Sequence, residues 1–318
     1  MNRAAGIVKH YWFPLLMAVL FLGGGAFIPY FLSPRNLLNV VRQSSIISLV
    51  AYGMTMVIIV KGIDLAVGGM MSCCAMISGL LMLGQWPPVF AVAVGLVTGI
   101  ALGAFNGMMV QKLEVPAFIT TLVVGQVAGG IALVLNNGRS IGGFPGSYVF
   151  IGNGSILGIP ISNYITLVFV IFCTILMART RLGTHIYALG GNDIVVKQQG
   201  ISSAKINYFV FSFSGFCAAS AGILLSAQLD TVHPTQGGNY QLDAVAACVI
   251  GGVSMAGGEG KIYMSLAGAL VIGFLRNALN LLGMHPFYQN IIVGVIIILI
   301  VAVSISSRQR KLELSRVF

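Results

Sequence analysis

The chain has 318 residues, of which 57% are hydrophobic and only 8% are charged. Soluble domains carry about a quarter charged residues, so this composition excludes a soluble globular protein. The apolar runs have the length of membrane-spanning helices and are too long for barrel strands. The net charge of +10 comes from cations at the ends of these runs, so it indicates membrane topology and not nucleic-acid binding. We therefore expect an all-α multi-pass membrane protein, with residues 1–318 forming one transmembrane domain.

The chain begins with Arg3 and Lys9 ahead of an apolar run, as a signal peptide does. That run is long and no A-x-A sequence follows it, which favours an uncleaved first span. About ten spans are expected, at 13–32, 43–60, 65–84, 88–110, 116–136, 163–178, 207–228, 243–256, 264–283 and 287–306. The eighth is too short and too glycine-rich for a plain helix, so we expect a broken or short segment near 243–258.

The distribution of cations predicts the orientation of these spans. With the N-terminus inside, only Arg35, Arg42 and Arg139 lie outside, and Arg276 lies within a span. All other lysines and arginines fall at cytoplasmic ends, which predicts that both termini are cytoplasmic.

The fourth expected span has four glycines at a spacing of four, Gly95, Gly99, Gly103 and Gly107. They share one face of a helix, where small residues allow close backbone approach. The face is either a sliding or dimer surface or a site of tight packing within the chain, and the second interpretation is favoured.

The chain has no residue pattern that indicates catalysis, a metal or a cofactor. Its five cysteines lie in apolar runs without CxxC spacing, which indicates buried small residues. Its four histidines are dispersed, so no metal site is expected. No G-x-x-x-x-G-K-[ST] sequence occurs, so the chain is not expected to be an enzyme that hydrolyses ATP.

The longest polar interruption in the second half, residues 179–206, is expected to be a cytoplasmic loop. Within it, Asn192 and Asp193 are favourable N-caps and Gly200 is a favourable residue after a helix end. These signals predict a helix of about two turns over 194–199, which includes Gln198. Its apolar face is expected to hold Ile194, Val195 and Ile201 and to dock into a groove on another protein.

A second motif, residues 61–69 (KGIDLAVGG), contains Gly62, Asp64 and Gly68. Asp64 is interpreted as an N-cap of the following helix at the cytoplasmic end, with an ion or proton site as the alternative. Residues 250–258 align with this motif after one gap, which indicates a partial internal repeat. The aligned segment includes Gly252, Ser254, Gly257 and Gly258, and places Ser254, another N-cap type, opposite Asp64. A chance match of glycine-rich segments is the alternative.

The outer side has two polar stretches, 136–162 and 229–242, which are either solvated connectors or a platform for an extracytoplasmic partner. Within the membrane, Arg276 has to pair, reach the surface or line a wet cavity. Polar residues inside spans are the candidates for a substrate path: Asn106, Gln126, Arg276 and Asn280.

Several motifs together resemble the membrane subunit of ribose-type bacterial ABC importers. They are 62–68 (GIDLAVG), 187–192 (YALGGN), Gly200 with Ile201, 240–247 (YQLDAVAA) and 257–260 (GGEG), in this order between residues 36 and 306. The sequence departs from the family's usual pattern at Ala66, Gln241, Ile194 and Val195. These departures bear on which sugar is carried and which ATPase is the partner, and not on the class of protein.

The resemblance implies a permease subunit in the bacterial inner membrane that imports a small sugar or a sugar-like molecule. It also implies three partners: a second permease copy or paralogue, a cytoplasmic ATPase with two nucleotide-binding domains, and a periplasmic substrate-binding protein. ATP and magnesium would be bound by the ATPase, and residues 192–201 correspond to the family's coupling helix.

The sequence leaves two other classes of transport protein as alternatives. A branched-chain amino-acid ABC permease is the nearest rival. A secondary transporter or facilitator is disfavoured because proton or sodium coupling needs a carboxylate near mid-membrane. The acidic residues are expected at span ends or in loops: Asp64, Glu114, Asp193, Asp230, Asp243, Glu259 and Glu313.

Overall fold

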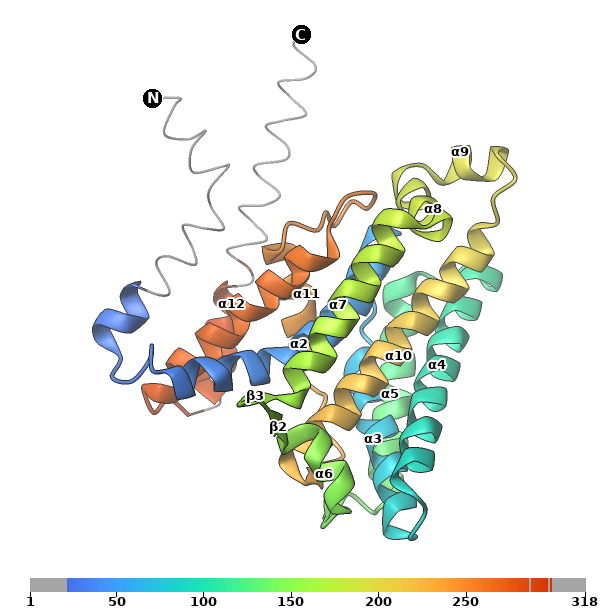
Figure 1. The fold of residues 1–318 in the computed structure, drawn as a ribbon. Helices are drawn as coiled ribbons and strands as arrows, with labels where there is room; N and C mark the ends of the chain where they lie inside the picture. Colours follow the sequence, from blue (N-terminus) through green and yellow to red (C-terminus); the bar gives the residue numbers. More distant parts are fainter. Residues whose placement is uncertain (1–21, 286, 297, 299–318) are drawn as a thin grey trace, which may run out of the picture.

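The computed structural model describes residues 22–285, 287–296 and 298. Its long helices lie roughly side by side, with α8 and α9 at one end and α6, β2 and β3 at the other (Figure 1). The long helices are α2 (Pro34–Ile59), α3 (Val67–Leu83), α4 (Pro88–Lys112), α5 (Ala117–Leu135), α7 (Ile161–Arg179), α10 (Ser203–Leu229) and α12 (Ile262–Leu281). The short ones are α6 (Gly146–Asn153), α8 (Arg181–Gly191), α9 (Asp193–Gln198) and α11 (Tyr240–Ile250).

In the described part of the chain, six helices are long and apolar enough to cross a membrane, namely α2, α4, α5, α7, α10 and α12. Two further expected spans are shorter, because α3 has 17 residues and α11 has 11. Residues 13–21 of the expected first span, 13–32, lie outside the described residues, as do 297 and 299–306 of the last, 287–306. The chain is thus an all-α multi-pass protein, and the count of ten spans and the position of the termini stay predictions.

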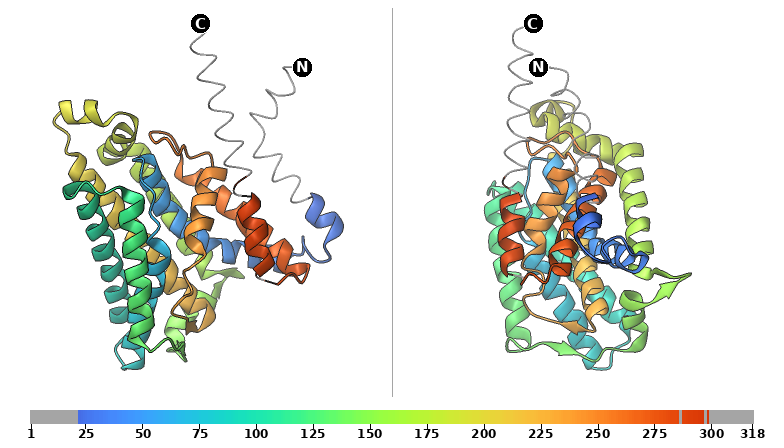
Figure 2. Two further views of the ribbon diagram at one scale, coloured as in Figure 1. Left: turned by 180° about the vertical axis from the view of Figure 1, so that it is seen from behind. Right: turned by 90° about the vertical axis from the view of Figure 1, so that its left-hand side faces the viewer.

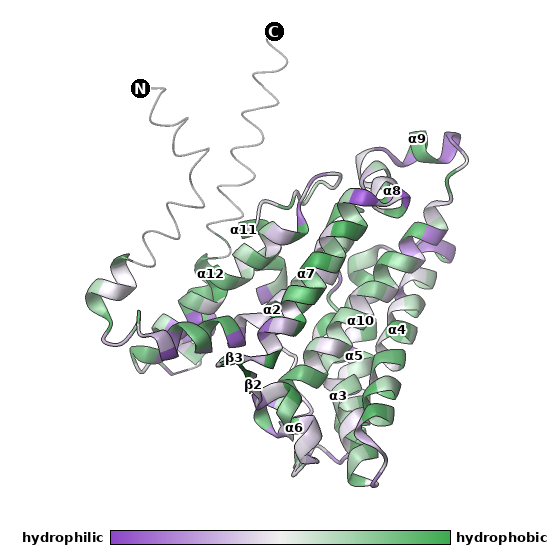
Figure 3. Ribbon diagram, in the orientation of Figure 1, coloured by the Kyte–Doolittle hydropathy of each residue, from purple (hydrophilic) through white to green (hydrophobic). Residues whose placement is uncertain are grey.

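Local signals in the sequence explain where several helices begin and which of their ends are polar. Prolines precede or begin α2, α4, α5 and α7, where a missing amide hydrogen costs nothing. The helices that end or begin at the α9 end carry cations there, as at Lys112, Arg179 and Lys205. Figure 3 shows hydrophilic residues at this end and again at the beginning of α2, with mostly hydrophobic residues along the helices between. This segregation matches a cytoplasmic side at the α9 end.

Helix α2 forms the centre of the bundle. Every residue from 44 to 59 is buried, and the helix packs against α10, α12, α11 and α7. By contrast, α4, α5 and α7 expose large apolar side chains, such as Val97, Val127 and Ile171, on their outward faces. In a lipid environment these faces need no cover, so the core is where the polar and small residues gather.

The four-glycine face of α4 lies inside the chain. Gly99 packs against the backbone of Gly215 and Gly103 against that of Phe211, both on α10. All four glycines are buried, so the intrachain interpretation is confirmed and this face of α4 is not available to a dimer. The five cysteines are free and buried, as expected.

The two outer polar stretches are joined in space. Strand β1 (Ile141–Gly142) pairs antiparallel with β4 (Thr231–Val232), and β2 (Ser155–Ile156) forms a hairpin with β3 (Ile159–Pro160). Asp230 accepts a hydrogen bond from the amide of Phe144 at 3.0 Å. The hairpin projects sideways from the bundle (Figure 2). Its tip residue, Leu157, is 94% exposed and has a left-handed backbone with φ of 52°.

The α4–α10 contact provides a direct test of this packing. A Cβ at Gly103 would overlap the carbonyl oxygen of Phe211, whereas a Cβ at Gly130 on α5 meets no atom within 4 Å. We expect Gly103→Val to destabilise the protein by about 1–3 kcal/mol through overpacking. Gly130→Val is the matched control, and thermal unfolding in detergent compares them. Equal midpoints for the two variants would contradict the packing described.

Candidate functional site

Helix α9 forms where the sequence predicts a capped cytoplasmic helix. The Asn192 side chain accepts hydrogen bonds from the amides of Ile194 and Val195, at 3.0 and 3.3 Å. Gly200 follows the helix with φ of 72°, a backbone conformation that favours glycine. The local sequence therefore determines both ends of this six-residue helix.

The apolar residues of α9 divide between two faces. Ile194 is 68% exposed and Val195 is 44% exposed, whereas Val196 is buried in the main core. Ile201, expected on the exposed face, is half-buried and packs against that core. The exposed apolar surface of α9 consequently consists of Ile194 and Val195. Gln198 lies in the last turn of the helix.

Polar contacts fix α9 to the rest of the protein. The Asp193 carboxylate pairs with Lys197 at 2.7 Å and accepts a hydrogen bond from the Ser203 hydroxyl of α10 at 2.8 Å. The Lys197 bond, followed by the Ser203 bond, lowers the pKa of Asp193 below its ordinary value. A lowered pKa keeps Asp193 ionised at neutral pH, and its contribution to stability is lost only as the pH falls through that pKa.

Helix α8, which precedes α9, was not expected from the sequence. Thr180 caps it by accepting a hydrogen bond from the amide of Gly183, and its buried positions include Ile186 and Leu189. The spacing of these residues is that of one helical face, which was the available signal. Helix α8 connects α7 and α9 and carries the 187–192 motif.

The 187–192 motif packs directly against two others. The Tyr187 hydroxyl donates to the carbonyl oxygen of Gly260 at 2.7 Å. Gly190 lies so close to the carbonyl of Ile59, the last residue of α2, that a Cβ would overlap it. The amide of Gly258 donates to the same Ile59 carbonyl at 2.9 Å.

These contacts define a joint, which we call the inner joint, formed by the end of α2, by 187–191 of α8 and by the 257–260 turn. Lys61 extends it by donating to the carbonyl of Gly191 at 3.4 Å, and a Cβ at Gly257 would meet the Lys61 side chain. The two segments of the proposed repeat thus touch each other here. Helix α8, the end of α2 and the 257–260 turn are therefore in direct backbone contact.

Asp64 lies inside the bundle and not at its cytoplasmic end. Its side chain is fully buried, and the carboxylate accepts from the Ser214 hydroxyl of α10 at 2.7 Å and from the Ala66 amide at 3.0 Å. The N-cap of α3 is Ala66, without a side-chain bond. The N-cap interpretation is therefore wrong in position, because the carboxylate closes a turn two residues before the helix.

The neighbouring residues complete a non-helical passage between α2 and α3. The Thr121 hydroxyl of α5 accepts from the Leu65 amide and donates to the Ile63 carbonyl, both at 3.0 Å. Buried backbone groups need such partners in the absence of water. Gly68 packs against the backbone of Gly237, whose amide donates to Ser72 at 3.0 Å.

The segment 250–258, aligned with the 61–69 motif, also differs from expectation at its serine. Ser254 lies in the turn after α11, where its amide donates to the Glu259 carbonyl at 3.0 Å. The N-cap of the next helix, α12, is Lys261. Gly252, Gly257 and Gly258 all have positive φ and shape this turn. Ser254 is consequently no equivalent of a helix cap.

Arg276 has a partner that the sequence did not indicate. Its guanidinium pairs with the Asp243 carboxylate of α11 at 2.8 Å, and the two side chains are 21% and 5% exposed. Asp243 was expected at a span end, yet its side chain is buried in the first turn of α11. The available signal was the arginine itself, because a cation within a span requires an anion on a neighbouring helix.

The four path candidates do not converge on one site. Asn106 lies on α4 and Gln126 on α5, whereas Arg276 and Asn280 lie on α12, which packs with α2 and α11. Gln126 is exposed, and Asn280 accepts from Gln289 at 2.7 Å. Asn106 is fully buried, and neither amide atom has a hydrogen-bond partner among the described residues.

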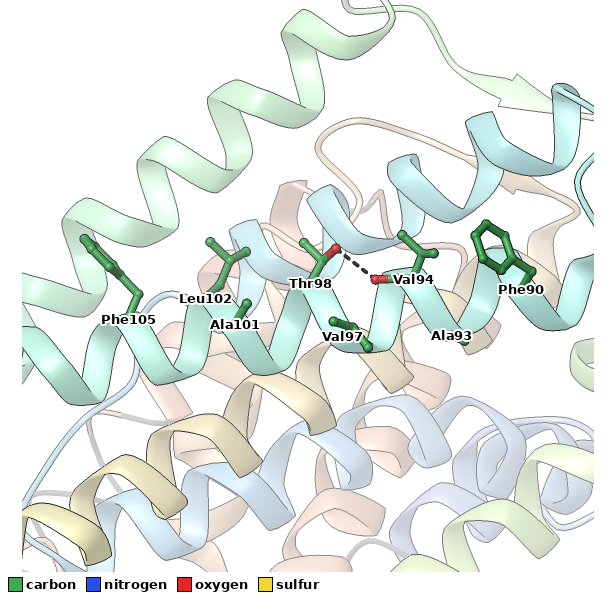
Figure 4. Close-up of a pocket in the computed structure, with 8 residues that line it drawn as sticks. All are labelled: Phe90, Ala93, Val94, Val97, Thr98, Ala101, Leu102 and Phe105. Carbon is green, nitrogen blue, oxygen red and sulfur yellow. Dashed lines mark hydrogen bonds between the residues drawn. The ribbon is translucent and has the colours of Figure 1, made fainter.

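A surface groove that lies along α4 is unsuited to a polar ligand. It has a volume of about 650 Å³ and is lined by Phe90, Ala93, Val94, Val97, Thr98, Ala101, Leu102 and Phe105 (Figure 4). Its one hydroxyl, that of Thr98, donates to the carbonyl of Val94 in its own helix at 2.9 Å. The groove therefore presents hydrocarbon, as a lipid-facing surface does.

The described chain is thus a multi-pass helical bundle with two short helices, α8 and α9, at one end and two non-helical passages. The family described as "Branched-chain amino acid transport system / permease component" matches residues 36–301. The chain belongs to this family.

Three relatives are similar over most of their length. The ribose import permease protein RbsC of Haemophilus influenzae is 40% identical over 86% of each chain. The D-allose transport system permease protein AlsC of Escherichia coli is 35% identical over 92% of this chain and 90% of its own. The L-arabinose transport system permease protein AraH of the same organism is 31% identical over 92% and 89%. No solved structure gives a significant match.

The buried ion pair generates a test by thermal unfolding. Arg276→Met leaves Asp243 buried without a partner, and we expect a loss of about 3–5 kcal/mol of stability. Arg276→Met with Asp243→Leu removes both charges, so most of that loss is recovered. A double variant no more stable than Arg276→Met would show that the pair does not act as a unit.

Proposed function

We propose that this chain is the permease subunit of an ABC importer that carries a small sugar into the cytoplasm. The observation that supports this most strongly is the printed substrate of the similar relatives, which is a monosaccharide in each of the three cases. The family description names branched-chain amino acids, so that substrate class is the alternative. The 40% identity to ribose import permeases favours the sugar.

Energy for transport would come from a separate ATPase that docks on α9. Ile194 and Val195 form a small exposed apolar face at the cytoplasmic end, and Asn192, Asp193 and Gly200 fix its position. Burial of these two side chains against a partner would contribute favourable free energy to binding. ATP and magnesium would then be bound by the partner and not by this chain.

The inner joint would transmit the movement of α9 into the membrane. Because Gly190 and Gly258 contact Ile59 through backbone atoms, α8 and the 257–260 turn move with the end of α2. The end of α2 leads into the non-helical passage that holds Asp64, and the 257–260 turn leads into α12. A push on α9 would thus reach the two interrupted regions, where we place the path.

The outer platform would receive substrate from a periplasmic binding protein. The β1–β4 pair, α6 and the β2–β3 hairpin assemble both outer stretches at the end opposite α9. A second copy or a paralogue of the chain would complete the permease. The structure buries Asp64 and Asp243, so the expectation that no carboxylate lies within the bundle is wrong and no longer argues against proton coupling. The preference for an ABC importer over a secondary transporter rests on the similarity to import permeases.

Coupling is tested by a single change on α9. We expect Ile194→Glu to weaken ATPase association by about 2 kcal/mol or roughly thirtyfold in Kd, because a charge replaces an apolar anchor. Co-purification and binding in nanodiscs measure the loss. Unfolding of the permease should be unaffected, since Ile194 is 68% exposed. Undiminished association would contradict the assignment of α9.

A matched change at the end of the bundle opposite α9 distinguishes contact with the binding protein from contact with the ATPase. Leu157→Glu alters another exposed apolar residue, at the tip of the outer hairpin. It should leave ATPase association unchanged but reduce the stimulation of ATPase activity by the sugar-loaded binding protein. A variant with normal stimulation would remove the hairpin from the platform.

A further inference from the structure

A polar pocket opens at the cytoplasmic end beside α9. It has a volume of about 400 Å³, within the range of small-molecule sites. Its lining comes from the α2–α3 passage, the α4–α5 turn, α9 and α10 and consists of Val60, Lys61, Gly62, Val110, Gln111, Glu114, Val115, Pro116, Ala117, Lys197, Asn207 and Phe211. Segments far apart in sequence therefore meet around one cavity.

The lining combines hydrogen-bonding groups of both kinds. Lys61 and Lys197 supply donors, Glu114 supplies acceptors, and the amides of Gln111 and Asn207 supply both. The Asn207 amide donates to the Gln111 side-chain oxygen at 2.8 Å, which holds the two amides together. The ring of Phe211 provides an apolar wall. Such a lining suits a molecule that has hydroxyl groups and a C–H face.

The charges favour a neutral ligand over an anion. Lys197 is already paired with Asp193 at 2.7 Å, and Glu114 offsets Lys61 within the lining. A phosphate ester would need an unpaired cluster of cations. The pocket instead offers nearly balanced charge, which a polyol can contact without leaving a charge uncompensated.

The pocket also adjoins a polar side chain in the bundle that has no hydrogen-bond partner. Asn106 lies one turn deeper than Val110 on the same face of α4, at the level of α10 where Gly103 packs against Phe211. Its buried amide has no hydrogen-bond partner among the described residues. Unsatisfied amides are costly in an apolar interior, so this side chain indicates a polar occupant or a hydrated extension of the pocket.

We infer that this pocket binds the imported monosaccharide at the cytoplasmic mouth of the path, in contact with the coupling helix through Lys197. The inference rests on the proposed function, since it takes the sugar as the product of import. It adds Gln111, Asn207, Glu114 and Phe211 as residues that contact the sugar before its release.

Cysteine protection tests the inference on the full chain in lipid nanodiscs. Val115→Cys places a thiol in the lining, and the five native cysteines are buried. D-ribose, D-allose and L-arabinose are added as probes during alkylation by a charged maleimide. One of them should slow the reaction about threefold at roughly twice its Kd, by mass action. Thr184→Cys on α8, outside the pocket, should react at a rate independent of sugar.

Two background variants show whether the amides cause the protection. Gln111→Met with Asn207→Leu keeps the volume but removes both amides, and it should abolish protection. Thr98→Val on the lipid-facing groove of α4 should retain it. The inference is overturned by a thiol that does not react, by protection that survives loss of both amides, or by protection with inorganic phosphate but not with sugar.

Sugar uptake into proteoliposomes that contain the chain, its ATPase and its binding protein distinguishes this inference from the proposed function. Uptake without cysteine protection contradicts the pocket alone. Absence of uptake with all partners present contradicts the proposed function, and with it the identity of the ligand.

Discussion

The structure depends on the contact between backbones at the inner joint. Ile59 ends α2, in which residues 44–59 are all buried, and its carbonyl oxygen accepts a hydrogen bond from the amide of Gly258 while facing Gly190. Side chains are absent at both glycines, so the contact has no flexible atoms that could absorb a displacement. Well-packed joints of this kind respond as units rather than by continuous deformation. A short helix on the surface can therefore act on the interior.

A second constraint, the need of buried backbone groups for hydrogen-bond partners, explains where the polar side chains lie. Non-helical backbone within a membrane bundle must find partners inside the protein. Thr121 satisfies two backbone groups of the α2–α3 passage, and Asp64 joins it to Ser214 of α10. The Arg276–Asp243 pair joins α11 to α12 in a similar way. These groups hold the interrupted segments in place without requiring continuous helices there.

Sequence reasoning succeeded where a local rule determines the structure. Asn192 and Gly200 delimit α9 because capping depends on neighbouring residues alone. The glycines of α4 predicted close packing, although the partner, α10, required the fold. The rules failed where position in the bundle decides the outcome. Asp64 has the residue type of a cap, yet its depth makes it a buried acceptor.

Asp243, the partner of Arg276 that the sequence did not indicate, shows most clearly what a sequence pattern cannot predict. Asp243 was placed at a membrane end because α11 was expected to begin there as a span. In the structure, residues 233–239 enter the bundle first, and Gly237 packs against Gly68 before α11 begins. The helix therefore starts at depth, and its first acidic residue lies opposite the arginine. A sequence pattern gives the register of a helix but not the depth at which it starts. That depth decides whether a carboxylate is solvated or has to be paired.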